Sequence, residues 1–180
     1  MTGGESGAAQ EHPSADDDGF VQWASLRRRR LRRTAYLLCA DWSAADDLVQ
    51  ESLVRVYRHW RRIASGEPDA YARKVLTSVF IDERRRPWRR ETATATVPEE
   101  ATVDEPSTVS GPLLDALRQV PPRQRAVLVL RFWEDLSVEQ TAQLLGCSTG
   151  NVKSQSARGL VRLRELLPEQ ALTYDEETAR

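Results

Sequence analysis

Residues 136–154 read LSVEQTAQLLGCSTGNVKS, and this stretch decides the fold of the second half of the chain. Ser137 followed by Gln140 forms a capping box, which predicts the start of a short helix. Gly146 is placed to end that helix, and Ser148 can cap a second, longer one. Two helices joined by a short turn with glycine are typical of a helix-turn-helix, whose second helix enters the major groove of DNA.

The second of these helices is expected to run to Pro168, with Val152 and Leu160 facing the protein interior. Its opposite face then points to solvent, and the side chains near its start are short, polar or basic. Such side chains suit base edges and phosphates, although an ordinary helical hairpin with a solvated face would look the same. The candidate DNA-binding residues are Ser148, Thr149, Asn151, Lys153, Ser154, Gln155 and Arg158.

Charge is distributed unevenly along the 180 residues, although 26 basic and 27 acidic side chains give a net charge of −1. Residues 20–90 and 113–168 are basic, whereas residues 1–19, 91–112 and 169–180 are acidic. Blocks of one sign usually mark tails or interaction surfaces, so the near-zero total does not exclude nucleic acid as a partner. Arginine far outnumbers lysine; GC-rich codon usage accounts for the ratio, but not for the clustering of the arginines.

The acidic stretches lack helical periodicity and divide the chain into domains. We interpret residues 1–18 as a disordered acidic tail, 91–111 as a flexible acidic linker and 169–180 as an acidic C-terminal tail. Two helical domains remain, at residues 19–90 and 112–168, and neither shows a strand pattern. The expected fold class is all-α, with two small helical domains joined by a linker long enough that they need not touch.

The first domain is expected to begin with two helices. The first covers residues 20–38, and its core candidates are Trp23, Leu26, Leu31, Ala35 and Leu38. The second begins at Ser43, which forms a capping box with Asp46, and it breaks at residues 65–68. Its residues at helical spacing are Leu48, Ser52, Leu53, Val56, Tyr57 and Trp60.

A third helix is capped by Asp69 and ends before Pro87. Basic residues gather along it and around Trp88, which suits a phosphate backbone. A salt-bridged surface is the alternative, because Asp82 and Glu83 can pair with neighbouring arginines. Tyr71 and Trp88 suit stacking on an unpaired base, although Tyr71 fits the core equally well. The basic residues are Arg73, Lys74, Arg84, Arg85, Arg86, Arg89 and Arg90.

The second domain is expected to contain two helices ahead of the helix-turn-helix. Pro112 suits the first position of one, and Pro121 with Pro122 begins the other. The apolar residues of the latter include Val127, Leu128, Leu130 and Phe132.

Enzymatic motifs do not occur in the sequence: there is no phosphate-binding loop, zinc-protease motif or glycine-rich nucleotide fingerprint. His59 is expected at the surface and Cys39 in a helix core. Cys39 and Cys147 lack metal-ligand spacing and indicate a reducing compartment. We therefore expect a cytoplasmic protein that is not an enzyme, with no cofactor, no metal, no small-molecule substrate and no membrane partner.

Both domains resemble the sigma-70 family of bacterial sigma factors. Residues 117–125, 128–131, 136–142 and 150–154 are similar to sigma region 4. The first half resembles region 2 through residues ADDLVQE at 45–51, with the segments Val56-Tyr57, AYARKV at 70–75 and DERRR at 82–86. Both regions in this order, joined by a short linker, resemble an extracytoplasmic-function (ECF) sigma factor of the actinobacterial sigma-E type.

This resemblance implies a subunit that directs core RNA polymerase to promoters. The helix from Thr149 to Arg164 would read the −35 element in duplex DNA, and the linker would lie in the RNA exit path. Region 2 would hold the melted −10 element through Tyr71, Arg73, Lys74, Ser78, Arg84, Arg85, Arg86 and Trp88. The polymerase β′ clamp helices would bind Asp47, Leu48, Gln50, Glu51, Val54 and Arg55. The β flap, promoter DNA and an anti-sigma factor are the further partners that the resemblance implies.

The sequence departs from the family pattern at two DNA-facing positions. Ser78 stands where the family often has asparagine, so a bidentate amide contact to adenine is missing. Gln155 stands where arginine is frequent, which leaves the −35 preference open. A stand-alone helix-turn-helix regulator and a non-DNA adaptor protein remain as alternatives from the residues alone.

Overall fold

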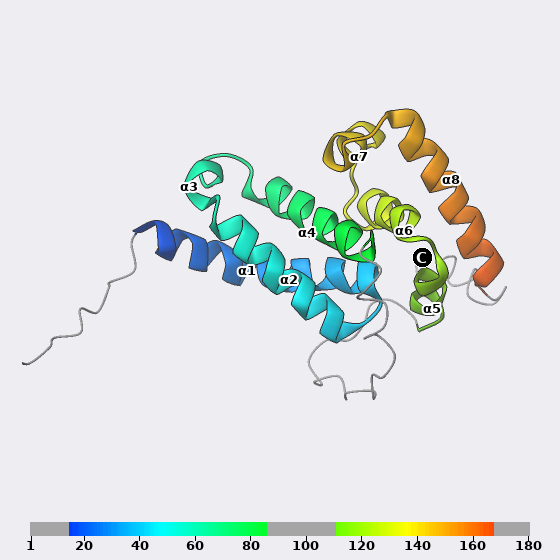
Figure 1. Cartoon of the computed structure of the whole chain (residues 1–180), viewed down its shortest axis with the longest axis horizontal. Helices are drawn as coiled ribbons and strands as arrows, with labels where there is room; N and C mark the ends of the chain where they lie inside the picture. Colours follow the sequence, from blue (N-terminus) through cyan, green and yellow to red (C-terminus); the bar gives the residue numbers. More distant parts are fainter. Residues whose placement is uncertain (1–14, 86–110, 168–180) are drawn as a thin grey trace, which may run out of the picture.

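The computed structural model describes residues 15–85 and 111–167, and these residues are helical in both halves of the chain (Figure 1). The first half contains α1 (Ala15–Cys39), α2 (Trp42–Tyr57), α3 (Trp60–Ile63) and α4 (Pro68–Arg85). The second contains α5 (Gly111–Gln119), α6 (Pro122–Leu128), the π-helix η2 (Val129–Trp133), α7 (Val138–Leu145) and α8 (Thr149–Leu166). No strand occurs within these two ranges, which confirms the all-α fold class.

Helix α1 begins at Ala15, so the predicted disordered tail ends too late, at residue 18. Acidic side chains stabilise the positive end of a helix, which explains why this acidic segment is helical. Asp17 also accepts a 2.6 Å hydrogen bond from the hydroxyl of Tyr57 on α2, which ties the first turn down. The rest of the predicted tail, most of the linker and the C-terminal tail lie outside the described residues.

The N-cap of helix α2 lies two residues before the predicted one. Asp41, not Ser43, is its N-cap, and the Asp41 carboxylate accepts a 2.8 Å hydrogen bond from the backbone of Ala44. Asp46 instead forms hydrogen bonds of 2.6 and 3.1 Å with Arg32 of α1. The helix also ends at Tyr57, ahead of the predicted break at residues 65–68, so Trp60 belongs to the short α3.

The two halves share one apolar core. Leu38 of α1 and Phe80 of α4 are almost fully buried at its centre. The second half contributes Leu114 and Leu117 from α5 to the same core, together with Ala126 of α6. Figure 1 shows α4 beside α6, and α6 and α7 both contact α4. The domains therefore pack closely in this structure, and we call this packing the closed arrangement.

Three apolar residues of the expected helices are exposed, and one of them, Leu26, was a core candidate. Leu26 is 72% exposed on α1, and Tyr57 is 48% exposed at the end of α2. Phe132 is 60% exposed because it lies in η2, whose wider turn shifts the helical face that the sequence pattern assumed. The expected burial of Cys39 and the expected exposure of His59 are confirmed.

The helix-turn-helix forms as the sequence predicts. Ser137 and Gln140 make both hydrogen bonds of a capping box, and Gly146 ends α7 with a left-handed φ of 61°. Ser148 caps α8 by accepting a 3.2 Å hydrogen bond from the backbone of Asn151. These local bonds fix the turn and therefore the direction in which α8 leaves α7.

Candidate nucleic-acid and polymerase interfaces

The N-terminal half of α8 presents its polar side chains to solvent. Val152 is fully buried against α6 and α7, which confirms the inward face of the helix. Ser148 is exposed but its hydroxyl is engaged as the N-cap, and Gln155 is half-buried. The exposed members of the predicted set are Thr149, Asn151, Lys153, Ser154 and Arg158.

An acidic side chain of α7 lies near this face. The pKa of Glu139 is lowered, chiefly by a hydrogen bond from its own backbone N–H and then by the hydroxyl of Ser137, 2.9 Å away. The positive charges of Lys153 and Arg131 lower it further. Glu139 therefore stays ionised and offsets part of the positive charge that Lys153 brings to α8.

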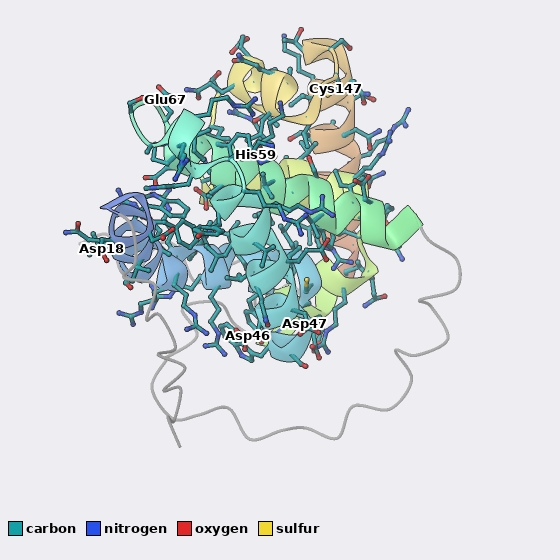
Figure 2. All side chains as sticks on the ribbon, turned by 60° about the vertical axis from the view of Figure 1, so that its left-hand side comes forward. Asp18, Asp46, Asp47, His59, Glu67 and Cys147 are labelled. Atoms are coloured by element: carbon teal, nitrogen blue, oxygen red, sulfur yellow. The ribbon has the colours of Figure 1, made fainter. Side chains whose placement is uncertain are left out.

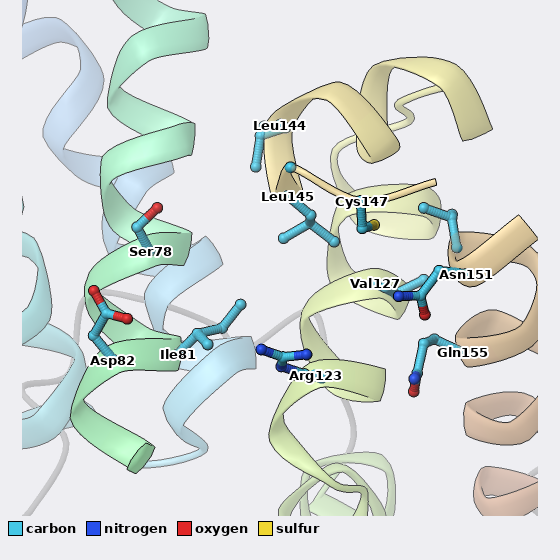
Figure 3. A pocket seen from close by; sticks show the side chains of 12 residues that line it. Ser78, Ile81, Asp82, Arg123, Val127, Leu144, Leu145, Cys147, Asn151 and Gln155 are labelled. Atoms are coloured by element: carbon cyan, nitrogen blue, oxygen red, sulfur yellow. The ribbon is translucent and has the colours of Figure 1, made fainter. Parts of the chain in front are cut away.

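A solvent-open cleft separates α8 from α4 (Figure 3). Asn151 and Gln155 line its α8 side, whereas Ser78 and Asp82 line its α4 side. Arg123 of α6 lies between them in Figure 3. The cleft has a volume of about 390 Å³. The closed arrangement therefore brings predicted −35 and −10 residues to opposite walls of one cleft.

Helix α4 presents the predicted −10 residues less freely than α8 presents its set. Lys74 is exposed, whereas Ser78 is half-buried and lines the cleft. Tyr71 is also half-buried, packing against the shared core with its ring centroid 5.8 Å from that of His59. The side chains of Arg84 and Arg85 are not described, and Arg86 and Trp88 lie outside the described residues.

Arg73, the remaining −10 candidate on α4, approaches an acidic residue of the second half. Its Nη1 atom lies 3.9 Å from Oε2 of Glu134, and its side chain is 21% exposed. Glu134 also accepts hydrogen bonds from Arg30 at 2.8 Å and Thr34 at 2.5 Å, both on α1. We call these four residues the Glu134 site. Sequence reasoning missed it, because 100 residues separate Thr34 from Glu134.

The predicted polymerase-binding residues lie mainly on one exposed face of α2. Asp47, Gln50 and Val54 are exposed, and Figure 2 shows Asp47 near Asp46 at the start of the helix. Glu51 and Arg55 are partly exposed and form a 2.6 Å ion pair with each other. Leu48 is only 1% exposed, so its assignment as a contact residue is wrong: it packs in the core beneath this face.

An apolar groove between α1 and α2 extends the same face. It has a volume of about 670 Å³ and is lined by Phe20 and Val21 of α1 and by Gln50, Val54 and Tyr57 of α2. The pKa of Tyr57 is raised, chiefly because its hydroxyl donates to Asp17. The sequence pattern counted Tyr57 only among the residues at helical spacing, and no prediction pointed to this groove.

The arginine run of α1 connects helices within the protein. Arg27 lies 3.0 Å from Asp69 at the start of α4. Arg32 pairs with Asp46 and lies 4.4 Å from the ring centroid of Trp42. Arg27 thus contacts α4 and Arg32 contacts α2. Arg30 contacts Glu134, directly after η2. These three arginines therefore form ion pairs within the protein.

Comparisons with known proteins match both halves to one family. The description "Sigma-70 region 2" matches residues 24–90, and "Sigma-70, region 4" matches residues 110–163. The RNA polymerase sigma-E factor of Streptomyces avermitilis is 40% identical over 156 residues, which cover 82% of this chain and 84% of that relative. The chain belongs to the ECF sigma factors.

Two further comparisons agree with this membership. The ECF RNA polymerase sigma factor SigE of Mycolicibacterium smegmatis is 29% identical over 97% of this chain and 71% of that relative. SigL of Mycobacterium tuberculosis, strain H37Rv, is 34% identical over 79% of this chain and 85% of that relative. As a sigma factor, the protein acts with core RNA polymerase in transcription initiation at promoters.

Solved sigma factors share the fold of this chain. RpoE of Bartonella quintana, solved with the anti-sigma factor NepR, has a TM-score of 0.63 and 25% identity, covering 82% of this chain and 95% of that one. CnrH, solved with the cytosolic domain of CnrY, has a TM-score of 0.55 and 21% identity, covering 82% and 86%.

The matched regions divide the sigma factor's candidate sites between them. Region 2 contains α2 and α4, with the polymerase-facing and −10 residues, and region 4 contains α8. The first turns of α1, including Phe20 and Val21 of the groove, precede the matched part. No helix within the described ranges is long and apolar enough to cross a membrane.

Proposed function

We propose that this sigma factor reads the −35 element with the exposed face of α8 and holds the melted −10 element with α4. The observation that supports this most is the capped helix-turn-helix, which turns the polar half of α8 outward. A helix in this setting docks in the major groove, where its first turns contact base edges. Lys153 and Arg158 contact phosphates, while Asn151 and Gln155 are suited to hydrogen bonds with bases.

The −10 element is held as a single strand along α4. Lys74 neutralises phosphates from an exposed position, and Arg73 adds a second positive charge when it is released from Glu134. Tyr71 is suited to stacking at the edge of the core, and Ser78 contacts a base edge. Arg84, Arg85, Arg86 and Trp88 complete this proposed set, which rests on sequence for those four residues.

Core polymerase binds the outer face of α2. The β′ clamp helices dock on Asp47, Gln50 and Val54, where charge and apolar surface lie side by side. Glu51 and Arg55 complete the contact, and the β flap binds region 4. Transcription initiation at chromosomal promoters takes place in the cytoplasm, so we place the protein there.

An anti-sigma factor is a further proposed partner. RpoE was solved with the anti-sigma factor NepR, and CnrH with the cytosolic domain of CnrY. The likeness of this chain to RpoE supports a regulator of the same kind, without identifying it.

Run-off transcription with purified core polymerase tests the proposal. Templates from a promoter library should yield transcripts that depend on this protein and on both the −35 and −10 elements. Replacing Gln50 and Glu51 with alanine should weaken binding to core polymerase about tenfold, because both side chains lie on the docking face.

The matched variant replaces Lys153 and Arg158 instead. It should bind core polymerase like the wild type while losing −35-dependent transcription. Loss of polymerase binding in this variant would contradict the assignment of the two faces. A folded protein that binds specific duplex DNA without polymerase, and supports no transcript, would favour a stand-alone regulator.

A further inference from the structure

We infer that Glu134 is an internal competitor of promoter DNA: it holds the two domains in the closed arrangement and keeps Arg73 from phosphate. The inference rests on the proposed role of α4 in −10 binding. It adds a regulatory contact within the chain itself, made by one carboxylate of region 4 with three side chains of region 2.

The carboxylate of Glu134 is almost fully buried, which is rare for an acidic side chain. Its side chain is 2% exposed, and its two oxygens face Arg30, Thr34 and Arg73, all from the other domain. The Nε atom of Arg73 is buried without a hydrogen-bond partner among the described residues. A buried charge is stable only when it is paired, so in the closed arrangement the Glu134 carboxylate relies on Arg30 and Arg73.

The π-turn of η2 positions this carboxylate. The backbone N–H of Glu134 donates to Val129 five residues earlier, at 3.0 Å, and the next residue, Asp135, adopts a left-handed φ of 52°. A wider turn of this kind is uncommon and often marks a functional site. Here it directs Phe132 outward and Glu134 inward against α1.

Two arginines of region 4 hold the same side of α1. Arg125 is buried and donates a 2.7 Å hydrogen bond to the carbonyl of Leu38. Arg118 donates to the carbonyl of Ala40, whose left-handed φ of 56° follows the end of α1. Cations are favoured at a helix C-terminus, so these contacts reinforce closure at the end of α1, beyond Thr34.

Closure restricts access to the −10 face of α4. Ser78 lines a cleft of about 390 Å³ that region 4 closes on its other side with Asn151 and Gln155. The negative charge of Glu134 lies beside Arg73, in the place that a DNA phosphate would take. Separation of the domains would free Arg73 and open the α4 side of the cleft, whereas most of the predicted −35 side chains are exposed already.

Single-molecule energy transfer on the full chain tests this inference. Labels are attached to cysteines introduced as Ser43→Cys on α2 and Ala157→Cys on α8, both exposed positions, with Cys39→Ala and Cys147→Ser as background. Glu134→Gln keeps the shape of the side chain and removes its charge. We expect the ratio of open to closed molecules to rise roughly tenfold, because Arg73 loses its charge partner.

Asp135→Asn is the matched control. It removes the same charge from the neighbouring, exposed residue, and asparagine accepts a left-handed backbone. This variant should match the wild type. Equal transfer in Glu134→Gln and wild type, with equal helicity by circular dichroism, would overturn the inference.

Binding of a labelled single-stranded oligonucleotide to the free chain tests the role of Arg73. Glu134→Gln should bind more tightly than Asp135→Asn, and adding Arg73→Ala should abolish that gain. A gain that survives Arg73→Ala would overturn the competition with DNA. Because the energy-transfer measurement uses neither DNA nor polymerase, failure of the proposed sigma activity would remain distinguishable from failure of the Glu134 contact.

Discussion

Helices α8 and α4 are both assigned to DNA, yet the protein presents them differently. Helix α8 exposes five of its predicted DNA-binding side chains and buries an apolar face within its own domain. Helix α4 exposes Lys74, but Ser78 faces the cleft and Arg73 faces Glu134 of the other domain. The −35 face is therefore completed by region 4 alone, whereas access to the −10 face depends on where region 4 lies.

Arginine content alone does not distinguish these two situations. The run on α1 is the densest in the described residues, and Arg27, Arg30 and Arg32 each pair with a carboxylate of another segment. Lys153 and Arg158, by contrast, stand alone in sequence on an exposed face. A basic residue is thus available to DNA only when the fold leaves no carboxylate to meet it, which is a property of tertiary structure.

Arg125→Met should have the largest effect on this comparison, because it breaks the contact that joins α6 to α1. Arg125 bonds the carbonyls of Leu38, Arg118 and Val120, and methionine would leave these acceptors without their donors. We expect the free energy of unfolding to fall by about 3 kcal/mol. Chemical denaturation measures this, and Arg123→Met on the same helix, at an exposed position, should change little.

The double variant Lys153→Ala with Arg158→Ala tests whether α8 is the available face. Both side chains are exposed, so their removal should lower transcription from a −35-dependent promoter roughly thirtyfold, equivalent to about 2 kcal/mol. Arg162→Ala with Arg164→Ala removes the same charge from the far end of α8 and should retain near-normal transcription. Equal loss in both variants would mean that charge alone, not the recognition face, carries binding.

Ser78→Asn sharpens the other side of the comparison. Asparagine offers adenine two hydrogen bonds that serine cannot, and the cleft beside Ser78 has room for the longer side chain. Selection from a library of −10 sequences should shift toward adenine at one position by about tenfold, or about 1.4 kcal/mol. Ser43→Asn on α2 should leave the preference unchanged, and an unaltered preference in Ser78→Asn would remove Ser78 from the −10 set.

Local features of the fold could be predicted from the sequence because their partners lie a few residues apart. The capping box of Ser137 and Gln140, the left-handed Gly146 and the cap at Ser148 all involve neighbours on the chain. The exact starts of α1 and α2, both rich in aspartate, were less predictable. Asp41 and Ser43 can both cap α2. Asp41 is the N-cap in the structure, and Asp46 of the predicted capping box is hydrogen-bonded to Arg32 of α1 instead.

Contacts between the domains could not be predicted from any local pattern. No sequence pattern singles out Glu134, and Arg73 is one base among many. Their meeting depends on the π-turn of η2 and on how α1 packs against region 4. Leu48 is a different case: it begins the series of α2 residues at helical spacing and is buried, and only the family resemblance assigned it to the polymerase face.

Gly159→Ala probes the packing that keeps α8 at its angle, and it should have the smallest effect. A Cβ atom at Gly159 would lie 2.9 Å from Cδ1 and 3.1 Å from Cγ of the buried Leu128, so α6 and α8 would have to separate slightly. Alanine is the better helix former, which offsets part of this overpacking, and we expect a net loss of about 1 kcal/mol in the free energy of unfolding.

Gly150→Ala provides the matched control for this last variant. At Gly150 the nearest atom to an added Cβ is the Ser148 hydroxyl, at 3.9 Å, so alanine meets open space and should be neutral or slightly stabilising. Thermal unfolding of both variants separates packing from helix propensity. If Gly159→Ala proved as stable as Gly150→Ala, α6 would not be what fixes the direction of α8, and the turn at Gly146 alone would have to aim the DNA-reading face.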